Sequence, residues 1–187
     1  MRTRMIAHIM CPASAKVKVL QMANSLTRLF QFKAWADDAL LSSLANIGDD
    51  AGVRDLAIEA LSHTYVVDRI FAAHLRDEPH GYRSANLEDM PTLEQLSRDI
   101  RASDQEYVAY VAKLGARQLA EKVDFMFTDG APGRMSREEM LLHVITHGAG
   151  HRGQVSALLL LNGLPTAADG FTTYLHQSEP AARRRAA

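Results

Sequence analysis

The chain has 187 residues, 47% of them hydrophobic and 23% charged, and its formal net charge is -1 with 21 basic and 22 acidic residues. This composition is typical of one globular domain and excludes a largely disordered chain. There is no basic excess to indicate nucleic-acid binding, no apolar run long enough to span a bilayer, and a single cysteine, so no intramolecular disulfide can form. We therefore expect a cytoplasmic protein with no nucleic-acid and no membrane partner.

The N-terminal residues are expected to lie outside the folded domain. Residues 1–21 contain a brief apolar stretch that is shorter than the apolar region of a secretion signal, so we interpret them as a flexible extension. A later start at Met22 fits the sequence equally well, because the first clear helical pattern follows it directly. The folded domain is predicted over residues 22–178.

Two long helical patterns come next, over about residues 25–47 and 51–76. Apolar residues recur three or four positions apart in both, as on one face of a helix. The expected inward positions are Leu26, Leu29, Phe30, Leu40, Leu44 and Ile47 in the first, and Val53, Leu56, Ala60, Val67 and Phe71 in the second. Gly48 is a natural end for the first helix.

Two further helices are predicted over about residues 92–115 and 136–163. They open with Thr-x-x-Gln and Ser-x-x-Glu respectively, which are both capping-box patterns. Between them, residues 123–130 partly alternate and end in Asp-Gly, which indicates a short hairpin. The predicted fold is an all-α four-helix bundle with a short hairpin or irregular segment between helices three and four. Residues 179–187 include three consecutive arginines and are predicted to be a disordered tail.

Histidines are concentrated in the fourth helix, at His143, His147 and His151. Positions four apart differ by about 40° around a helix, so His147 and His151 can direct their imidazoles at one point. His143 lies about 80° from His151 and can pair with His147 instead. On the second helix, His63 occupies the core-facing stripe and can supply a third ligand. Three histidines without a fourth protein ligand would leave an open coordination position, as catalytic zinc sites do.

The same pattern also has a structural interpretation. An inward histidine is more often a hydrogen-bonded core residue than a metal ligand, and pairs four apart also arise by chance. The residues alone leave both interpretations open. Three glycines near the pair, Gly148, Gly150 and Gly153, each cost about 0.5–1 kcal/mol relative to alanine inside a helix. We expect them to permit close approach of another backbone or of a ligand.

Several motifs occur together along the chain. They are Trp35, His63-Thr-Tyr-Val-Val-Asp68, His143-Val-Ile-Thr-His147, His151-Arg-Gly-Gln154, Asn162-Gly163 and the segment from Asp169 to Tyr174-Leu175. With these motifs the sequence resembles the DinB/YfiT-like family of bacterial four-helix-bundle metalloproteins over about residues 22–177.

The resemblance implies that His63, His147 and His151 are the metal ligands and that His143 has no metal role. By helical geometry, Asp68 and Arg152 point away from these ligands, so we expect both to form structural ion pairs. Relatives often carry asparagine at the position that Thr146 occupies here.

A divalent ion held by three neutral imidazoles keeps its positive charge and acidifies whatever binds its fourth position. Bound water would become hydroxide, as in hydrolases, and a bound thiol would become thiolate. Characterised members of the resembled family include transferases and isomerases that use low-molecular-weight thiols such as mycothiol and bacillithiol. The resemblance therefore implies a metal-dependent thiol S-transferase acting on a small-molecule substrate, with a hydrolase as the other enzymatic hypothesis. The sequence does not identify catalytic or thiol-binding residues.

Two hypotheses without catalysis stand beside the enzymatic ones. The chain can be a metal-binding stress-response protein or a metal-dependent dimerisation module, or a structural bundle whose histidines are incidental. Three imidazoles suit zinc or nickel first, and also iron. A low-molecular-weight thiol is the expected second cofactor, and the resemblance also implies a homodimer.

Overall fold

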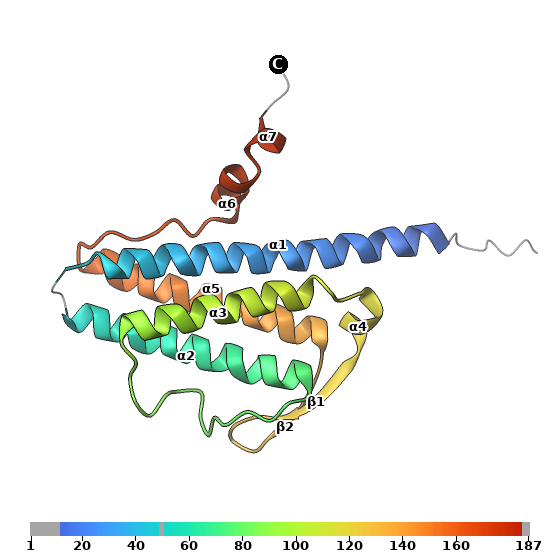
Figure 1. Cartoon of the computed structure of the whole chain (residues 1–187), viewed down its shortest axis with the longest axis horizontal. Helices are drawn as coiled ribbons and strands as arrows, with labels where there is room; N and C mark the ends of the chain where they lie inside the picture. The colour runs from blue at the N-terminus through green and yellow to red at the C-terminus, as the bar shows by residue number, and fades with distance from the viewer. Residues whose placement is uncertain (1–11, 49–50, 185–187) are drawn as a thin grey trace, which may run out of the picture.

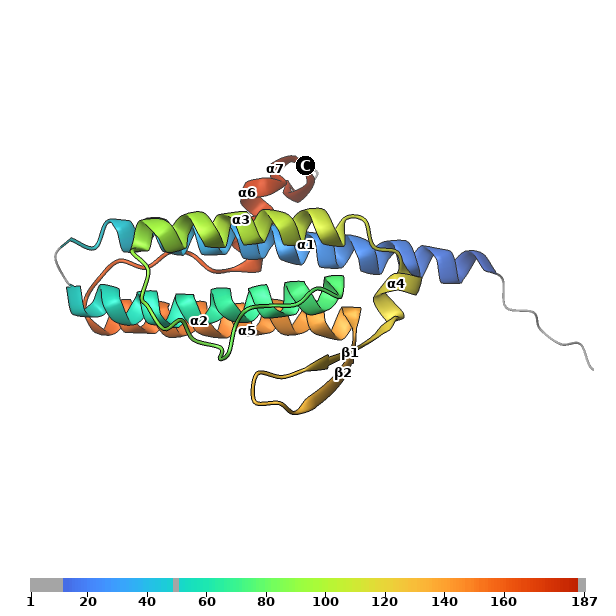
Figure 2. The same ribbon diagram turned by 60° about the horizontal axis from the view of Figure 1, so that its bottom comes forward.

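The computed structural model describes residues 12–48 and 51–184, and four long helices form its body (Figure 1). These helices are α1 (Pro12–Ala45), α2 (Ala51–Arg76), α3 (Leu93–Val111) and α5 (Arg137–Leu161). Helices α1 and α3 form one layer, and α2 and α5 form the other (Figure 2). The predicted all-α four-helix bundle is thus confirmed. No helix of the described part is long and apolar enough to cross a membrane.

The hairpin predicted between the third and fourth long helices is present. A short helix, α4 (Ala116–Ala120), leads into strands β1 (Lys122–Met126) and β2 (Pro132–Ser136), which pair antiparallel. The hairpin lies on the outer side of the layer formed by α2 and α5 (Figure 2). Both predicted capping boxes are also formed, at the N-termini of α3 and α5.

Two short helices that were not predicted follow α5. They are α6 (Phe171–Ser178) and α7 (Pro180–Arg183), and they project away from the bundle beside α1 (Figure 1). Aromatic rings attach α6 to α1, because Phe171 lies 5.3 Å from Phe32 and Tyr174 lies 5.8 Å from Trp35 between ring centroids. The aromatic residues in this segment therefore have a structural role.

The two predicted terminal segments both contain helix. Helix α1 begins at Pro12, a residue well suited to the first turn, so it includes residues 12–21 of the predicted extension. In the predicted tail, Glu179 pairs with Arg28 of α1 and with Arg183 of α7. Residues 1–11 and 185–187 lie outside the described residues. The domain limits at residues 22 and 178 stay a prediction.

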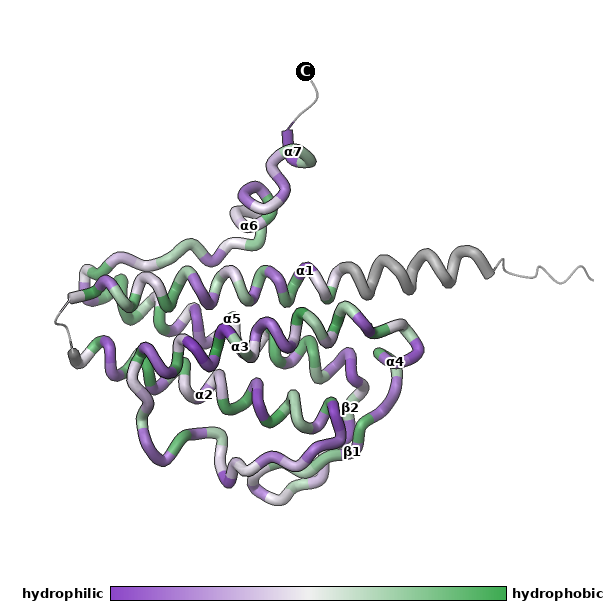
Figure 3. Tube along the Cα trace, viewed as in Figure 1, coloured by the Kyte–Doolittle hydropathy of each residue, from purple (hydrophilic) through white to green (hydrophobic). Residues whose placement is uncertain are grey.

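Apolar and polar segments alternate along each helix, as amphipathic packing requires (Figure 3). The buried apolar residues form two clusters, one at each end of the bundle. The first includes Phe30, Phe71, Tyr107 and Met140, and the second includes Leu44, Leu61, Ile100 and Leu159. Of the predicted inward positions, Leu56 is wrong: its side chain is 54% exposed, on a face of α2 that no other long helix covers.

Between the two apolar clusters lies a layer of buried charges. The Lys33 ammonium of α1 is 2.8 Å from an oxygen of Asp37, 2.8 Å from one of Asp68 on α2 and 2.7 Å from one of Asp104 on α3. From α5, the Arg152 guanidinium lies 3.0 Å from Asp37 and 2.9 Å from Asp169. The expected ion-pair roles of Asp68 and Arg152 are thus confirmed, and the layer joins all four long helices.

The carboxylates outnumber the cations in this layer, and their pKa values respond to that imbalance. Burial raises the pKa of Asp68 to about 6 and that of Asp104 to about 7, although Lys33 opposes both shifts. Burial acts in the same direction on Asp37, but that carboxylate contacts both cations, and Lys33 and Arg152 together lower its pKa. The raised pKa values favour protonation of Asp68 and Asp104, and each proton bound there reduces the excess negative charge.

We expect Lys33→Met to lower the free energy of unfolding by about 3–5 kcal/mol, because it leaves buried carboxylates without their cation. Chemical denaturation followed by circular dichroism measures the change. As the control, Arg101→Ala removes an exposed pair with Asp38 and should cost no more than about 1 kcal/mol. A loss for Lys33→Met as small as that of the control would contradict the central role of the charged layer.

The raised pKa of Asp104 predicts a pH dependence of stability. Between its unfolded pKa of about 4 and its folded pKa of about 7, the folded protein binds more protons, so the free energy of unfolding falls as pH rises. We expect Asp104→Asn to make this slope shallower, by at most about 1.4 kcal/mol per pH unit. Denaturation series from pH 4 to pH 8 measure it. Asp38→Asn makes the same charge change at an exposed position, and an equal effect of both variants would count against the assignment.

Candidate metal centre

The structure brings together the three histidines that the sequence analysis selected. His63 projects from α2, and His147 and His151 project from α5. The Nε2 atoms of His63 and His151 each lie 3.2 Å from Nε2 of His147. One ring nitrogen from each of the three lies within 4.8 Å of the other two, and no other such group of histidine, cysteine or acidic residues occurs in the described part.

The spacing of these nitrogens fits a tetrahedral metal ion. Two nitrogens that each lie about 2.0–2.1 Å from a tetrahedral zinc are about 3.3 Å apart, close to the observed 3.2 Å. Three lone pairs directed at one point repel each other unless a cation or a proton lies between them. The donor set therefore fits a divalent metal, and the three histidines are positioned to hold one.

The loop between α2 and α3 fixes the orientation of His63. Its Nδ1 atom is 2.9 Å from the carbonyl oxygen of Ala85 and 3.1 Å from the side-chain oxygen of Asn86. Both partners only accept hydrogen bonds here, so Nδ1 carries the ring proton and donates it. The Nε2 atom then presents its lone pair to the other two histidines, which is the tautomer that metal binding requires.

The other two histidines are held neutral by their surroundings. Burial lowers the pKa of His147 to about 4, and the neighbouring His151 and His63 add to this shift. Burial followed by His63 lowers the pKa of His151 as well, while the side chain of Gln154 acts in the opposite direction. Neutral imidazoles keep the lone pairs that a metal needs. The Nδ1 atoms of His147 and His151 are buried and have no hydrogen-bond partner in the described part.

Two neighbouring histidines lie outside this group. The His143 ring stacks on Phe71 at a centroid distance of 4.6 Å and lies 5.4 Å from the His147 ring. The His74 ring, one turn beyond Phe71 on α2, contacts His80 at 5.0 Å. Thr146, where relatives often carry asparagine, donates its hydroxyl to the backbone carbonyls of Leu142 and His143 on its own helix, so these bonds do not orient a histidine ring.

Of the three glycines only Gly148 is closely approached, and by side chains rather than by the backbone or ligand that we expected. A Cβ atom on Gly148 would lie 3.3 Å from Cε of Lys33 and 3.9 Å from a methyl carbon of Thr64, so side chains rather than a backbone or ligand approach it. At Gly150 and Gly153 nothing lies within 4 Å of a Cβ position. The expected close approach at these two glycines is wrong, because both face outward.

A cavity of about 330 Å³ adjoins the three histidines. Its walls come from α2, α5, the hairpin and the loop before α3, and we call it the aromatic pocket. It is lined by His63, Val67, Ile70, Phe71, His74, Ala85, Phe125, Phe127, Thr128, Met135, His143 and His147. None of these residues is acidic, and none is a lysine or an arginine. Two of the three candidate histidines, His63 and His147, therefore face a cavity with no acidic, lysine or arginine side chain in its wall.

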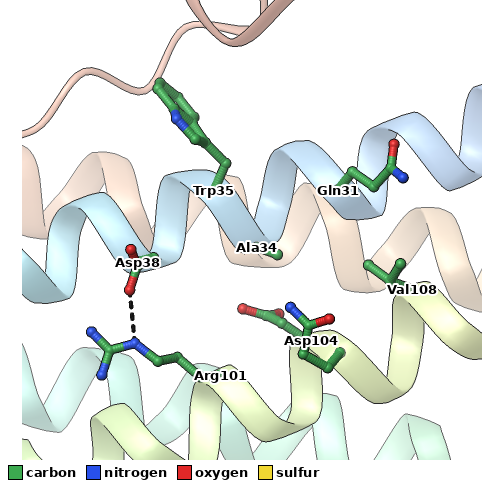
Figure 4. Close-up of a pocket in the computed structure, with 8 residues that line it drawn as sticks. Gln31, Ala34, Trp35, Asp38, Arg101, Asp104 and Val108 are labelled. Atoms are coloured by element: carbon green, nitrogen blue, oxygen red, sulfur yellow. Dashed lines mark hydrogen bonds and ion pairs between the residues drawn. The ribbon is translucent and has the colours of Figure 1, made fainter. Parts of the chain in front are cut away.

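A second cavity, of about 480 Å³, lies between α1 and α3 (Figure 4). The ion pair between Asp38 and Arg101 lies at its edge, and Asp104 of the charged layer lines it. It contains no histidine and lies in the opposite layer from His63 and His147. We therefore place the candidate site at the aromatic pocket.

Sequence reasoning selected the three histidines that the structure brings together, but not the residues around them. Ala85 and Asn86 lie in a loop with no helical or strand pattern, so no periodicity pointed to their contact with His63. Phe125 and Phe127 lie in the segment whose partial alternation predicts a hairpin, and alternate residues of a strand share one face. That signal gave no information on which helices this face would cover.

Comparison with known proteins relates the whole fold to one family. The family model described as "DinB family" matches residues 22–184. Among solved structures, a DinB-like protein from Bacillus cereus ATCC 10987 superposes with a TM-score of 0.54 at 16% sequence identity. The match covers 78% of this chain and 95% of that one, and at this identity it supports the fold alone. No curated protein matches the sequence.

In metal-free protein we expect His147 to titrate with a pKa of about 4, whereas an unperturbed histidine titrates near about 6.5. Between these values the unfolded chain binds more protons, so the contribution of His147 to stability is lost as pH falls from about 6.5 to about 4. Histidine-selective NMR in the presence of a chelator measures the pKa, and the same spectra should show His63 protonated at Nδ1. A His147 pKa at or above 6.5 would contradict a neutral donor set.

Proposed function

Because the chain belongs to the DinB family, we propose that it binds one divalent metal ion through His63, His147 and His151 and uses it to activate a small thiol or a water molecule. The convergence of three ring nitrogens carries the proposal: Nε2 of His63 and Nε2 of His151 each lie 3.2 Å from Nε2 of His147, and one nitrogen of each ring lies within 4.8 Å of the other two. Zinc or nickel is the preferred ion, with iron as a further option, since imidazole nitrogen suits all three.

The residues of the chain set the state of the metal. Three uncharged ligands leave the positive charge of a bound ion intact, and that charge lowers the pKa of a thiol or water at the remaining coordination position. The contact of His63 with Ala85 and Asn86 holds one ligand in the required tautomer. The aromatic pocket is lined by both His63 and His147, so a small molecule bound in it would lie against two of the three proposed ligands.

Thiol S-transfer is the reaction that we favour. The thiol loses its proton to solvent, its sulfur forms a bond to an electrophilic carbon of the substrate, and the leaving group departs with the electron pair of the broken bond. This reaction needs no carboxylate acid or base in the site, and none lines the pocket. Hydrolysis by an activated water is the second enzymatic route, and it would use the same three ligands.

The absence of acidic, lysine and arginine side chains from the pocket lining equally suits a metal-binding stress-response protein or dimerisation module without turnover. The enzymatic and non-catalytic classes differ in one measurable property, which is whether a substrate is turned over when metal is bound. Consumption of a thiol identifies S-transfer among the enzymatic routes. The homodimer and the cytoplasmic location stay predictions.

We expect tag-free wild-type protein to contain about one metal ion per chain, and His63→Ala, His147→Ala and His151→Ala each to lose most of it. Loss of a direct ligand should weaken binding by more than the 10–100-fold typical of changes around ligands (about 1.4–2.7 kcal/mol). Elemental analysis measures metal content. His176→Ala is the control, because this exposed ring bonds only to the backbone of α6.

Wild-type protein that takes up no divalent metal would refute the proposed centre. If metal is present, metal-dependent thiol consumption with electrophilic substrates separates the two functional classes. Activity that disappears in His147→Ala and persists in His176→Ala would support the enzyme, and metal binding without any turnover would support the non-catalytic alternative.

A further inference from the structure

The aromatic pocket has a chemical character of its own, separate from the metal ligands. Three phenylalanine rings follow each other along its wall, with Phe71 and Phe125 at a centroid distance of 6.1 Å and Phe125 and Phe127 at 4.9 Å. Met135 and Ile70 extend this apolar surface. Aromatic and thioether groups of this kind bind planar apolar groups by edge and face contacts.

The hairpin is built to carry these rings. Gly133 pairs with Phe125 across the two strands. A Cβ atom on Gly133 would lie 2.5 Å from the Phe125 ring and 2.9 Å from the Phe127 ring, so no side chain can occupy this position while both rings remain in place. The glycine thus allows two aromatic side chains to lie together on the hairpin face that covers the helices.

The size and charge of the pocket limit its occupant. A cavity of about 150 Å³ holds one benzene molecule, so about 330 Å³ accommodates a one- or two-ring group. No acidic, lysine or arginine side chain lines the pocket, so in the metal-free protein an ionised group placed there would lose hydration without gaining an oppositely charged side chain from these residue types. The pocket wall offers polar contacts through Thr128 and through His74, whose Nε2 atom is buried without a hydrogen-bond partner in the described part.

From this geometry we propose that the substrate of the centre is an uncharged small molecule whose aromatic or similarly bulky apolar group fills the aromatic pocket. Its reactive atom would then face His63 and His147. The inference rests on the proposed function for the reaction, but the binding of the apolar group depends only on the pocket. Phe125 and Phe127 of the hairpin determine specificity, and they do not take part in the chemistry.

Indole and indole-3-carboxylate test the pocket, because they share a two-ring system and differ in charge. Titration calorimetry uses purified full-length protein, both as isolated and after chelator treatment. We expect indole to bind both forms, and indole-3-carboxylate to bind the chelator-treated form at least about 10-fold more weakly. Phe127→Ala should weaken indole binding by about 3- to 10-fold through loss of an aromatic contact.

Two further variants make the result specific. Ala85→Phe fills the pocket from the loop while keeping the backbone carbonyl that orients His63, so it should abolish indole binding. Phe171→Ala removes an aromatic ring on α6, outside the pocket, and should leave binding unchanged. Circular dichroism and metal content, measured on every variant, show whether the fold and the centre are intact.

The outcomes separate this inference from the metal proposal. Wild-type protein that binds metal but not indole overturns the pocket assignment and leaves the metal centre standing. Equal affinity of the chelator-treated protein for the two probes overturns the requirement for an uncharged ligand. Indole binding that is lost in Ala85→Phe and weakened in Phe127→Ala supports the pocket, even if the wild type holds no metal.

Discussion

The ammonium group of Lys33 is the interaction on which the rest of the structure depends. It lies within 2.8 Å of carboxylates from three helices, and Arg152 adds the fourth helix through Asp37. Separating two ions of a buried pair leaves an unpaired charge in an apolar interior, so the layer tolerates little sliding or rotation of one helix against another. The two apolar clusters on either side contain most of the buried apolar side chains. The charged layer between them fixes how the helices are aligned against one another.

The same helix register also positions the histidines, because two residues that pack against the charged layer are their neighbours in sequence. Gly148 and Thr64 follow His147 and His63 directly, and a Cβ on Gly148 would meet both Thr64 and Lys33. The absence of that Cβ lets α5 approach α2 and α1 at the level of the site. Successive residues of a helix point about 100° apart. Because Gly148 and Thr64 face the charged layer, His147 and His63, one residue earlier, point toward the hairpin. The spacing of 3.2 Å between ligand nitrogens follows from this close helix contact.

Much of the architecture was predictable because it depends on local patterns. Helical periodicity and two capping boxes gave the four long helices, and residues four apart on one helix gave the pair His147 and His151. Contacts between distant segments were beyond such patterns. Lys33 interrupts the apolar stripe of its helix. Its three carboxylate partners lie on three different helices, so the periodicity within any one helix does not indicate that these groups meet. Similarly, α6 forms because its aromatic residues dock on α1 beyond a loop, and nothing in its own eight residues requires a helix.

The separation of charge within the fold explains how one small bundle can hold a reactive centre. The ionised side chains of the interior are gathered in one layer, where Lys33 and Arg152 pair with four carboxylates. Helices α2 and α5 also carry the histidine site, on another face. The site contains neutral imidazoles, and the adjoining pocket contains no ionised side chain. A cation bound there would have no carboxylate ligand to offset its charge, and the apolar walls would screen it poorly. Its full effect on a fourth ligand therefore depends as much on where this chain places its acidic residues as on the three histidines themselves.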